Sequence, residues 1–185
     1  MRRALLAAIL AMVGTAGCTT GLKQVYHTAV GASARYYEVK SLGGPNALDR
    51  FTAVGVDSFD PSPMLGAVPS SFAGPVQTAV VKRLIETQMF SSVAKGAPAP
   101  GGVLIRGKFV DFDPGGSAFR AVGFGVDPFL TAQIELVDTA SNQVLGVAMV
   151  TGTIKSAVRT GSAELADGIA KAVKGLVEQH HTKRE

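Results

Sequence analysis

Residues 129–138 read FLTAQIELVD, and this stretch decides the class of fold. Apolar side chains at positions 130, 132, 134 and 136 alternate with polar ones at 131, 133 and 135. Such a period of two predicts a strand with one face buried in a core and the other in contact with water. Residues Asp138 to Asn142 predict a turn, with Asn142 suited to a left-handed backbone, and residues 144–154 predict the returning strand.

Two amphipathic helices flank this hairpin in the sequence. A strand is expected over residues 51–59, before Pro61 and Pro63 interrupt it. A helix is then expected to begin between Ser71 and Pro75, because serine caps and first-turn prolines are favoured there. Its apolar residues recur at 76, 80 and 84. Strands are expected again from Gly101 and over residues 119–126, and a second helix opens near Ser162.

The order is therefore strand, helix, strand, strand, strand, helix. A strand–helix–strand unit implies parallel pairing with a crossover, whereas the short turns that follow require antiparallel neighbours. These features predict an α+β fold, a two-layer sandwich in which a mixed sheet of four to five strands carries both helices on one face.

The first twenty residues, MRRALLAAILAMVGTAGCTT, have the layout of a bacterial secretory signal. Two arginines precede an apolar run that is too short to span a bilayer, and small residues lead to the only cysteine. Thr15-Ala16-Gly17-Cys18 resembles the lipobox of bacterial lipoproteins, with threonine in place of the usual leucine. The resemblance implies cleavage between Gly17 and Cys18 and acylation of the Cys18 sulfur.

This signal sets the expected domain organisation. Residues 1–17 form the signal peptide, and residues 18–48 form the lipidated cysteine and a tether, although residues 35–40 also fit a short strand. Residues 49–179 form a single α+β domain, and residues 180–185 form a disordered tail. The protein is expected in the cell envelope, and Thr19 after the cysteine favours the outer membrane, on the periplasmic side.

Charge and composition narrow the expected partners. Cleavage of the signal peptide would remove Arg2 and Arg3. The mature chain would then have 16 basic residues instead of 18 against 14 acidic ones, and its formal charge would be +2 instead of +4. The sequence has no basic run with interleaved aromatic residues, so nucleic-acid binding is not expected. No cofactor or metal is expected, because the only cysteine carries lipid and the three histidines lie outside the predicted domain core.

A family resemblance rests on three features in order: the strand ending at Phe59, the helix leading to Phe90 and Val93, and residues 120–138, RAVGFGVDPFLTAQIELVD. Together these resemble the bacterial lipoproteins of the domain-of-unknown-function 4410 family. More distantly, the order of elements is similar to the periplasmic part of the curli-secretion lipoprotein and to the amino-terminal domain of TolB. Those relatives bind other envelope proteins and have no catalytic site.

One cluster of residues stands out as a partner-binding candidate. Phe119, Phe124 and Phe129 lie near Arg120 around Gly123 and Gly125, where a bulge is expected. These rings either fill the core or form an exposed aromatic and arginine patch that docks a partner.

Three functions remain open from the sequence. The preferred hypothesis is a noncatalytic, membrane-anchored envelope lipoprotein that contacts another protein or the cell wall. The first alternative is a lipoprotein that binds a small ligand in space left by Gly123, Gly125 and Gly146. The second is a hydrolase using Asp111 and Asp113, which would share a strand face about 7 Å apart.

Overall fold

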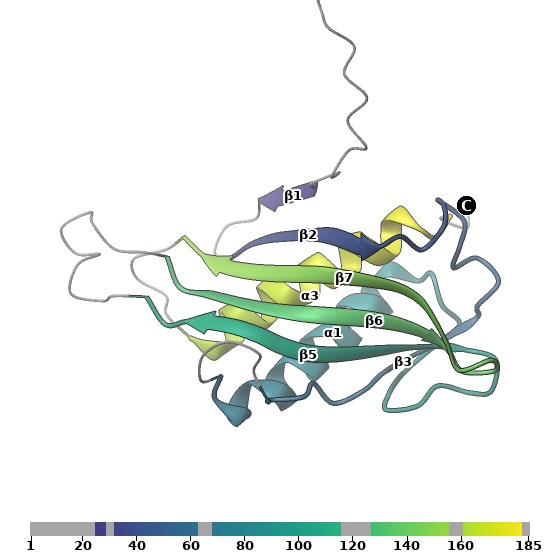
Figure 1. Cartoon of the computed structure of the whole chain (residues 1–185), viewed down its shortest axis with the longest axis horizontal. Coiled ribbons are helices and arrows are strands. Elements are labelled where there is room, and N and C mark those ends of the chain that lie inside the picture. Colours follow the sequence, from purple (N-terminus) through teal and green to yellow (C-terminus); the bar gives the residue numbers. More distant parts are fainter. Residues whose placement is uncertain (1–24, 29–31, 63–67, 116–126, 156–160, 183–185) are drawn as a thin grey trace, which may run out of the picture.

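The computed structural model describes residues 25–28, 32–62, 68–115, 127–155 and 161–182. Its elements follow one another as shown in Figure 1. They are β1 (Val25–Thr28), β2 (Ala32–Lys40), β3 (Ala53–Val56), the short 3-10 helix η1 (Ser70–Phe72), α1 (Ala73–Thr87), β4 (Ser92–Lys95), β5 (Val103–Asp113), β6 (Phe129–Asp138), β7 (Gln143–Ile154) and α3 (Ser162–Gln179).

The described strands form one mixed sheet in the order β1-β2-β7-β6-β5-β3-β4. Strand β3 lies between β4 and β5 and runs parallel to both, and α1 forms the crossover from β3 to β4. The other neighbours are antiparallel. The predicted α+β class and mixed sheet are confirmed. The predicted number of strands is wrong, because the described sheet has seven. The additional strands are β1, β2 and β4, which lie toward its two edges.

Strand β6 occupies the middle of the sheet, between β5 and β7. Its apolar set at 130, 132, 134 and 136 is buried, and the polar residues between them are half-buried on the opposite face. Asn142 in the following turn has φ 54°, the left-handed conformation that its short polar side chain tolerates.

Both helices cover the same face of the sheet, and they lie behind it in Figure 1. In α1 the side chains of Val76, Val80 and Leu84 are fully buried. Helix α3 approaches β7 so closely that a Cβ added to Gly168 would lie 2.7 Å from the Cα of Gly152. Glycine at both positions therefore permits backbone contact between helix and sheet.

The structure corrects the predicted tether over residues 18–48. Strand β2 pairs along its length with β7, and Ala32, Ala34 and Tyr36 are buried beneath the helices. Leu48, which follows the strand, is also fully buried. The folded domain thus includes residues 32–48, because β2 supplies one side of the core against α3.

The predicted disordered tail is also partly wrong. His180 and His181 follow α3 directly, and their residues are only 3% and 4% exposed. Thr182 donates its backbone N–H to the Asp49 carboxylate at 2.7 Å. The chain is therefore packed against the loop after β2 as far as residue 182.

Candidate functional site

The residues predicted from the sequence as sites are only partly described. Cys18, Gly17, Phe119, Arg120 and Phe124 lie outside the described residues, as do Gly123 and Gly125 of the expected bulge. Phe129 is the first residue of β6 and is half-buried, opposite Thr153 of β7 and Asp113 of β5. The structure therefore places one member of the aromatic patch at the end of the sheet from which residues 116–126 depart.

The two carboxylates of the hydrolase hypothesis both bond to nearby backbone. Asp111 accepts the N–H of Phe112 at 2.8 Å, and Asp113 accepts the N–H of Gly115 at 2.7 Å. The second bond closes the turn that follows β5, where Gly115 has φ 70°. Both aspartates are half-buried at the end of this strand. Their observed role is to shape the backbone.

A buried polar cluster, which we call the C-terminal cluster, joins Tyr36 and Glu38 of β2 to Gln179 and His180 at the end of α3. The His180 ring places Nε2 2.8 Å from Glu38 Oε1 and Nδ1 2.6 Å from the carbonyl oxygen of Gly44. A carbonyl and a carboxylate oxygen only accept hydrogen bonds, so both partners of the His180 ring are acceptors. Sequence reasoning missed this cluster, because its members are far apart in the chain.

Tyr36, Gln179 and Glu38 form the remaining hydrogen bonds of the C-terminal cluster. The Tyr36 hydroxyl donates to Gln179 Oε1 at 2.7 Å and lies 3.1 Å from the carbonyl oxygen of Gly175. Gln179 Nε2 donates to Glu38 Oε1 at 3.2 Å, and the N–H of Leu42 donates to Glu38 Oε2 at 3.1 Å. Glu38 thus accepts three hydrogen bonds, as expected of a carboxylate that stabilises the folded domain.

Titration of the C-terminal cluster reflects these contacts. Burial raises the pKa of Glu38, but the hydrogen bonds from His180 and Leu42 outweigh it and hold the pKa below its ordinary value of 4.5. Burial, with a smaller contribution from Glu38, raises the pKa of Tyr36 to about 12. Both shifts favour the charge states in which the observed hydrogen bonds form.

His181 anchors the neighbouring loop. Its ring meets Phe90 edge-on at 5.2 Å between centroids, and its Nδ1 lies 2.8 Å from the carbonyl oxygen of Thr182 and 3.4 Å from Asp49 Oδ1. The Nε2 atom is buried and has no hydrogen-bond partner within the described ranges. Within those ranges, no three His, Cys, Asp or Glu side chains are grouped as metal ligands.

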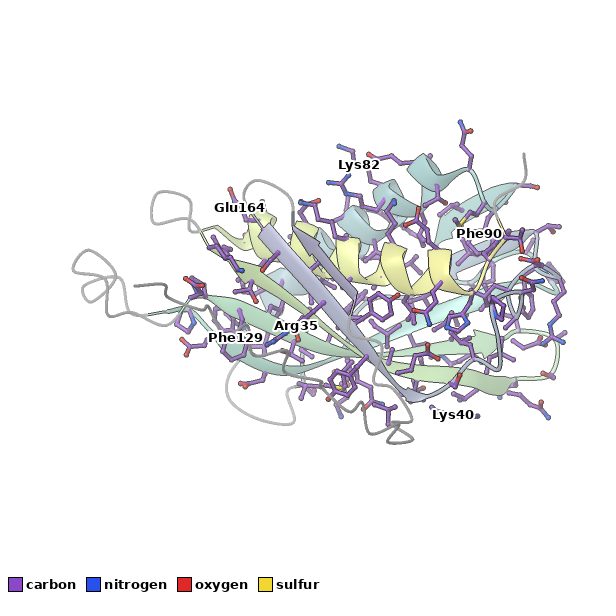
Figure 2. All side chains as sticks on the ribbon, turned by 90° about the horizontal axis from the view of Figure 1, so that it is seen from above. Arg35, Lys40, Lys82, Phe90, Phe129 and Glu164 are labelled. Atoms are coloured by element: carbon purple, nitrogen blue, oxygen red, sulfur yellow. The ribbon has the colours of Figure 1, made fainter. Side chains whose placement is uncertain are left out.

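The face of β2 that is turned away from the helices carries an exposed amphipathic strip, which we call the β2 strip. It consists of Arg35, Tyr37, Val39 and Lys40, all four exposed. Tyr37 is 42% exposed and Val39 is 63% exposed, so two large apolar groups lie in solvent between two cations. Figure 2 shows β2 from above with Arg35 and Lys40 labelled. The alternation in ASARYYEVK contained this signal.

Of the three glycines that suggested room for a small ligand, only Gly146 lies within the described residues. A Cβ added at Gly146 would lie 2.5 Å from Leu42 Cγ, so the Leu42 side chain already fills that space. A cavity of about 130 Å³ lies instead at the opposite end of α3. Its apolar walls include Phe72, Phe112, Pro114, Pro128, Ile154 and Leu165.

Among the residues that the structure describes, neither α1 nor α3 combines enough length with enough apolar character to span a membrane.

Two solved structures share this fold at low sequence identity, and a third is less similar. A variant of PelC from Paraburkholderia phytofirmans, solved as a dodecamer, has a TM-score of 0.51 and 19% identity, covering 78% of this chain and 96% of that chain. A second PelC dodecamer from the same organism has a TM-score of 0.51 and 17% identity, with coverages of 82% and 99%. A DUF330 protein from Xanthomonas campestris has a TM-score of 0.43 and 15% identity, with coverages of 74% and 86%.

Sequence comparison identifies the family more directly. The curated proteins contain no match to this chain. The model of the family described as Domain of unknown function (DUF4410) matches residues 49–157, from the loop after β2 to just beyond β7. The match covers more than half of the chain and confirms the resemblance expected from the strand–helix order and residues 120–138. The chain therefore belongs to the DUF4410 family.

Proposed function

We propose that this protein is a noncatalytic lipoprotein of the bacterial cell envelope, held at a membrane by acyl chains on Cys18 and acting through contacts with other proteins. The observation that carries the proposal is the position of Cys18 in a lipobox-like sequence directly before the fold. Only residues 19–24 separate it from β1, which lies at one edge of the described sheet. That segment reaches at most about 25 Å, so acylation would hold the domain close to the bilayer.

The buried polar groups support a contact function over a catalytic one. Tyr36, Glu38 and His180, which in other settings serve as acids and bases, form hydrogen bonds inside the fold. His180 bonds to Glu38 and to a backbone carbonyl, and Tyr36 bonds to Gln179 and to a backbone carbonyl. Their hydrogen bonds connect β2 to the end of α3. The exposed surface, including the β2 strip, is then the part of the domain that meets other molecules.

Self-association is one form that these contacts take in our proposal. The two PelC chains with the same fold are dodecamers, and each is covered almost completely by the alignment with this chain. At 17–19% identity the likeness shows the fold alone. The likeness is a reason to measure the mass of the detergent-extracted protein first, because that mass shows whether the protein associates with itself.

The test compares the wild-type chain with Cys18→Ala in cell fractions and in crosslinking. Wild type should sediment with the outer membrane and crosslink to itself or to one specific envelope protein. Cys18→Ala should lose the membrane association. Equal distribution of the two chains between membrane and soluble fractions would contradict the anchor, and an acylated monomer without any specific crosslink would contradict the contact function.

Ligand binding is the second candidate, and the apolar cavity beside α3 favours it. Its volume of about 130 Å³ is well below the roughly 300–1,000 Å³ of typical small-molecule sites. The cavity suits a few carbon atoms, such as one apolar side chain. We therefore place ligand binding behind protein contact, and a survey of small apolar ligands by thermal shift tests it.

A further inference from the structure

We propose that the β2 strip lies on the surface of the membrane, where Arg35 and Lys40 contact anionic lipid headgroups and Tyr37 and Val39 enter the interface. This inference rests on the proposed acylation of Cys18 and adds a specific orientation to it. The anchor alone would leave the domain free to rotate about the segment that joins it to Cys18. A lipid-binding face would fix which side of the sheet contacts the bilayer.

The composition of the strip is the first argument. Tyr37 and Val39 are two of the three large hydrophobic residues that the described chain exposes. They lie between the exposed cations Arg35 and Lys40 on a single strand. An amphipathic ring and an aliphatic group flanked by basic side chains match the chemistry of the bilayer interface, where tyrosine is enriched and cations meet anionic headgroups.

The neighbouring strand extends the apolar part of the strip. The register pairs Tyr37 with Met149 and Lys40 with Val147, both half-buried on β7. Arg35 pairs with Thr151, which carries no charge. The outward face of β2 and β7 therefore presents apolar and hydroxyl groups around two cations, without a carboxylate on either strand of that face.

Acidic groups near the strip are directed elsewhere. Glu38 lies between Tyr37 and Val39 in the sequence but points to the helix side, where His180 and Gln179 bond to it. On the outward face, Glu135 of β6 pairs with Val147 in register and accepts a hydrogen bond from Gln133 Nε2 at 3.4 Å. Lys40 Nζ donates to the carbonyl oxygen of Val144, which leaves its charge unneutralised. The strip remains cationic.

The position of the anchor is the second argument. Strand β2 is the neighbour of β1, and the chain passes from Cys18 into these two strands first. Residues 19–24 reach at most about 25 Å from β1, so the anchor would hold β1 and its neighbour β2 close to the bilayer. Figure 1 shows β1 and β2 together at one margin of the sheet, with β3 at the other. A lipid surface is therefore the partner that the chain brings to this face.

The experiment measures which face of the acylated protein touches lipid. A thiol is introduced by Tyr37→Cys, with Lys82→Cys on the exposed side of α1 as the matched control. The Cys18 sulfur carries lipid, so each variant has one free thiol for an environment-sensitive fluorophore. Both proteins are reconstituted in phosphatidylcholine–phosphatidylglycerol vesicles that contain spin-labelled lipid, and quenching of the fluorophore reports contact with the bilayer.

We expect strong quenching at position 37 and little at position 82. Each basic residue at an anionic surface favours contact about fivefold, so adding Arg35→Gln and Lys40→Gln should lower the equilibrium constant for contact by about thirtyfold and weaken the quenching. The control pair Lys82→Gln and Lys95→Gln removes the same charge from α1 and β4, at the opposite edge of the sheet, and should leave it unchanged.

The outcomes separate this inference from the anchor. Equal quenching at both positions in an acylated chain overturns the orientation and leaves the anchor intact. Quenching at position 37 that persists after Cys18→Ala, in a chain with no acyl group and a single thiol, supports the face independently of the anchor. Protection of position 37 that depends on protein density and not on lipid overturns the inference in favour of a second copy covering the strip.

Discussion

The Nε2 atom of His180 lies 2.8 Å from Oε1 of Glu38, and this contact joins residues 142 positions apart in the sequence. It fastens the end of α3 to β2, the second strand after the proposed anchor. Figure 1 shows the end of α3 near the end of β2. The contact therefore joins the N-terminal part of the sheet to the end of the last helix.

Replacing His180 with alanine should destabilise the fold by about 2–4 kcal/mol. The substitution removes the two hydrogen bonds of the ring, to Glu38 and to the carbonyl oxygen of Gly44, and leaves the half-buried Glu38 carboxylate with one donor fewer. Urea unfolding measures the change. Lys82→Ala, at an exposed position on α1, is the control and should stay within about 0.5 kcal/mol of wild type. A His180→Ala chain as stable as this control would show that the cluster contributes nothing.

Acid should weaken the fold through Glu38. Its folded pKa lies below the ordinary 4.5, so the stability that it provides is complete above that value and is lost as pH falls through the folded pKa. Asp167, whose pKa is also lowered despite its burial by bonds from Lys171 and Arg83, acts in the same direction. The difference in unfolding free energy between wild type and Glu38→Gln, measured from pH 7 to pH 3, isolates the Glu38 contribution. That difference should shrink as pH falls, and a constant difference would contradict the assignment.

Gly168→Ala should destabilise the fold by about 1–3 kcal/mol, because the added methyl group meets the backbone of Gly152 and forces α3 away from β7. Gly74→Ala is the matched control on α1, where an added Cβ has no neighbour within 4 Å. The control should be neutral or stabilising by about 0.5 kcal/mol, since alanine favours the helix. Thermal unfolding of both variants compares them. Equal behaviour would mean that α3 does not contact the sheet at this point.

The sequence predicted those elements whose pattern is local and strong. The alternation of β6 and the four-residue spacing of Val76, Val80 and Leu84 identified a central strand and a helix, because one buried face imposes each period. Strand β2 was less visible, since its buried set begins with two alanines, Ala32 and Ala34, whose apolar signal is weak. The short edge strand β4 has no fully buried residue to identify it.

The site features depended on contacts between distant parts of the chain. Adjacent histidines near a C-terminus look like a solvated tail, and only the packing of α3 against β2 brings His180 to Glu38. Gly146 suggested space in the sequence, but the side chain that occupies it, Leu42, belongs to a loop more than a hundred residues earlier. The aromatic patch at Phe119, Arg120 and Phe124 stays a prediction, because those residues lie outside the described ranges.

The mass of the mature protein, purified in detergent from envelope membranes, tests the proposed anchor most directly. The account predicts a chain that begins at Cys18 and carries acyl groups on its sulfur. A chain that still begins at Met1 with a free thiol at position 18 would contradict it.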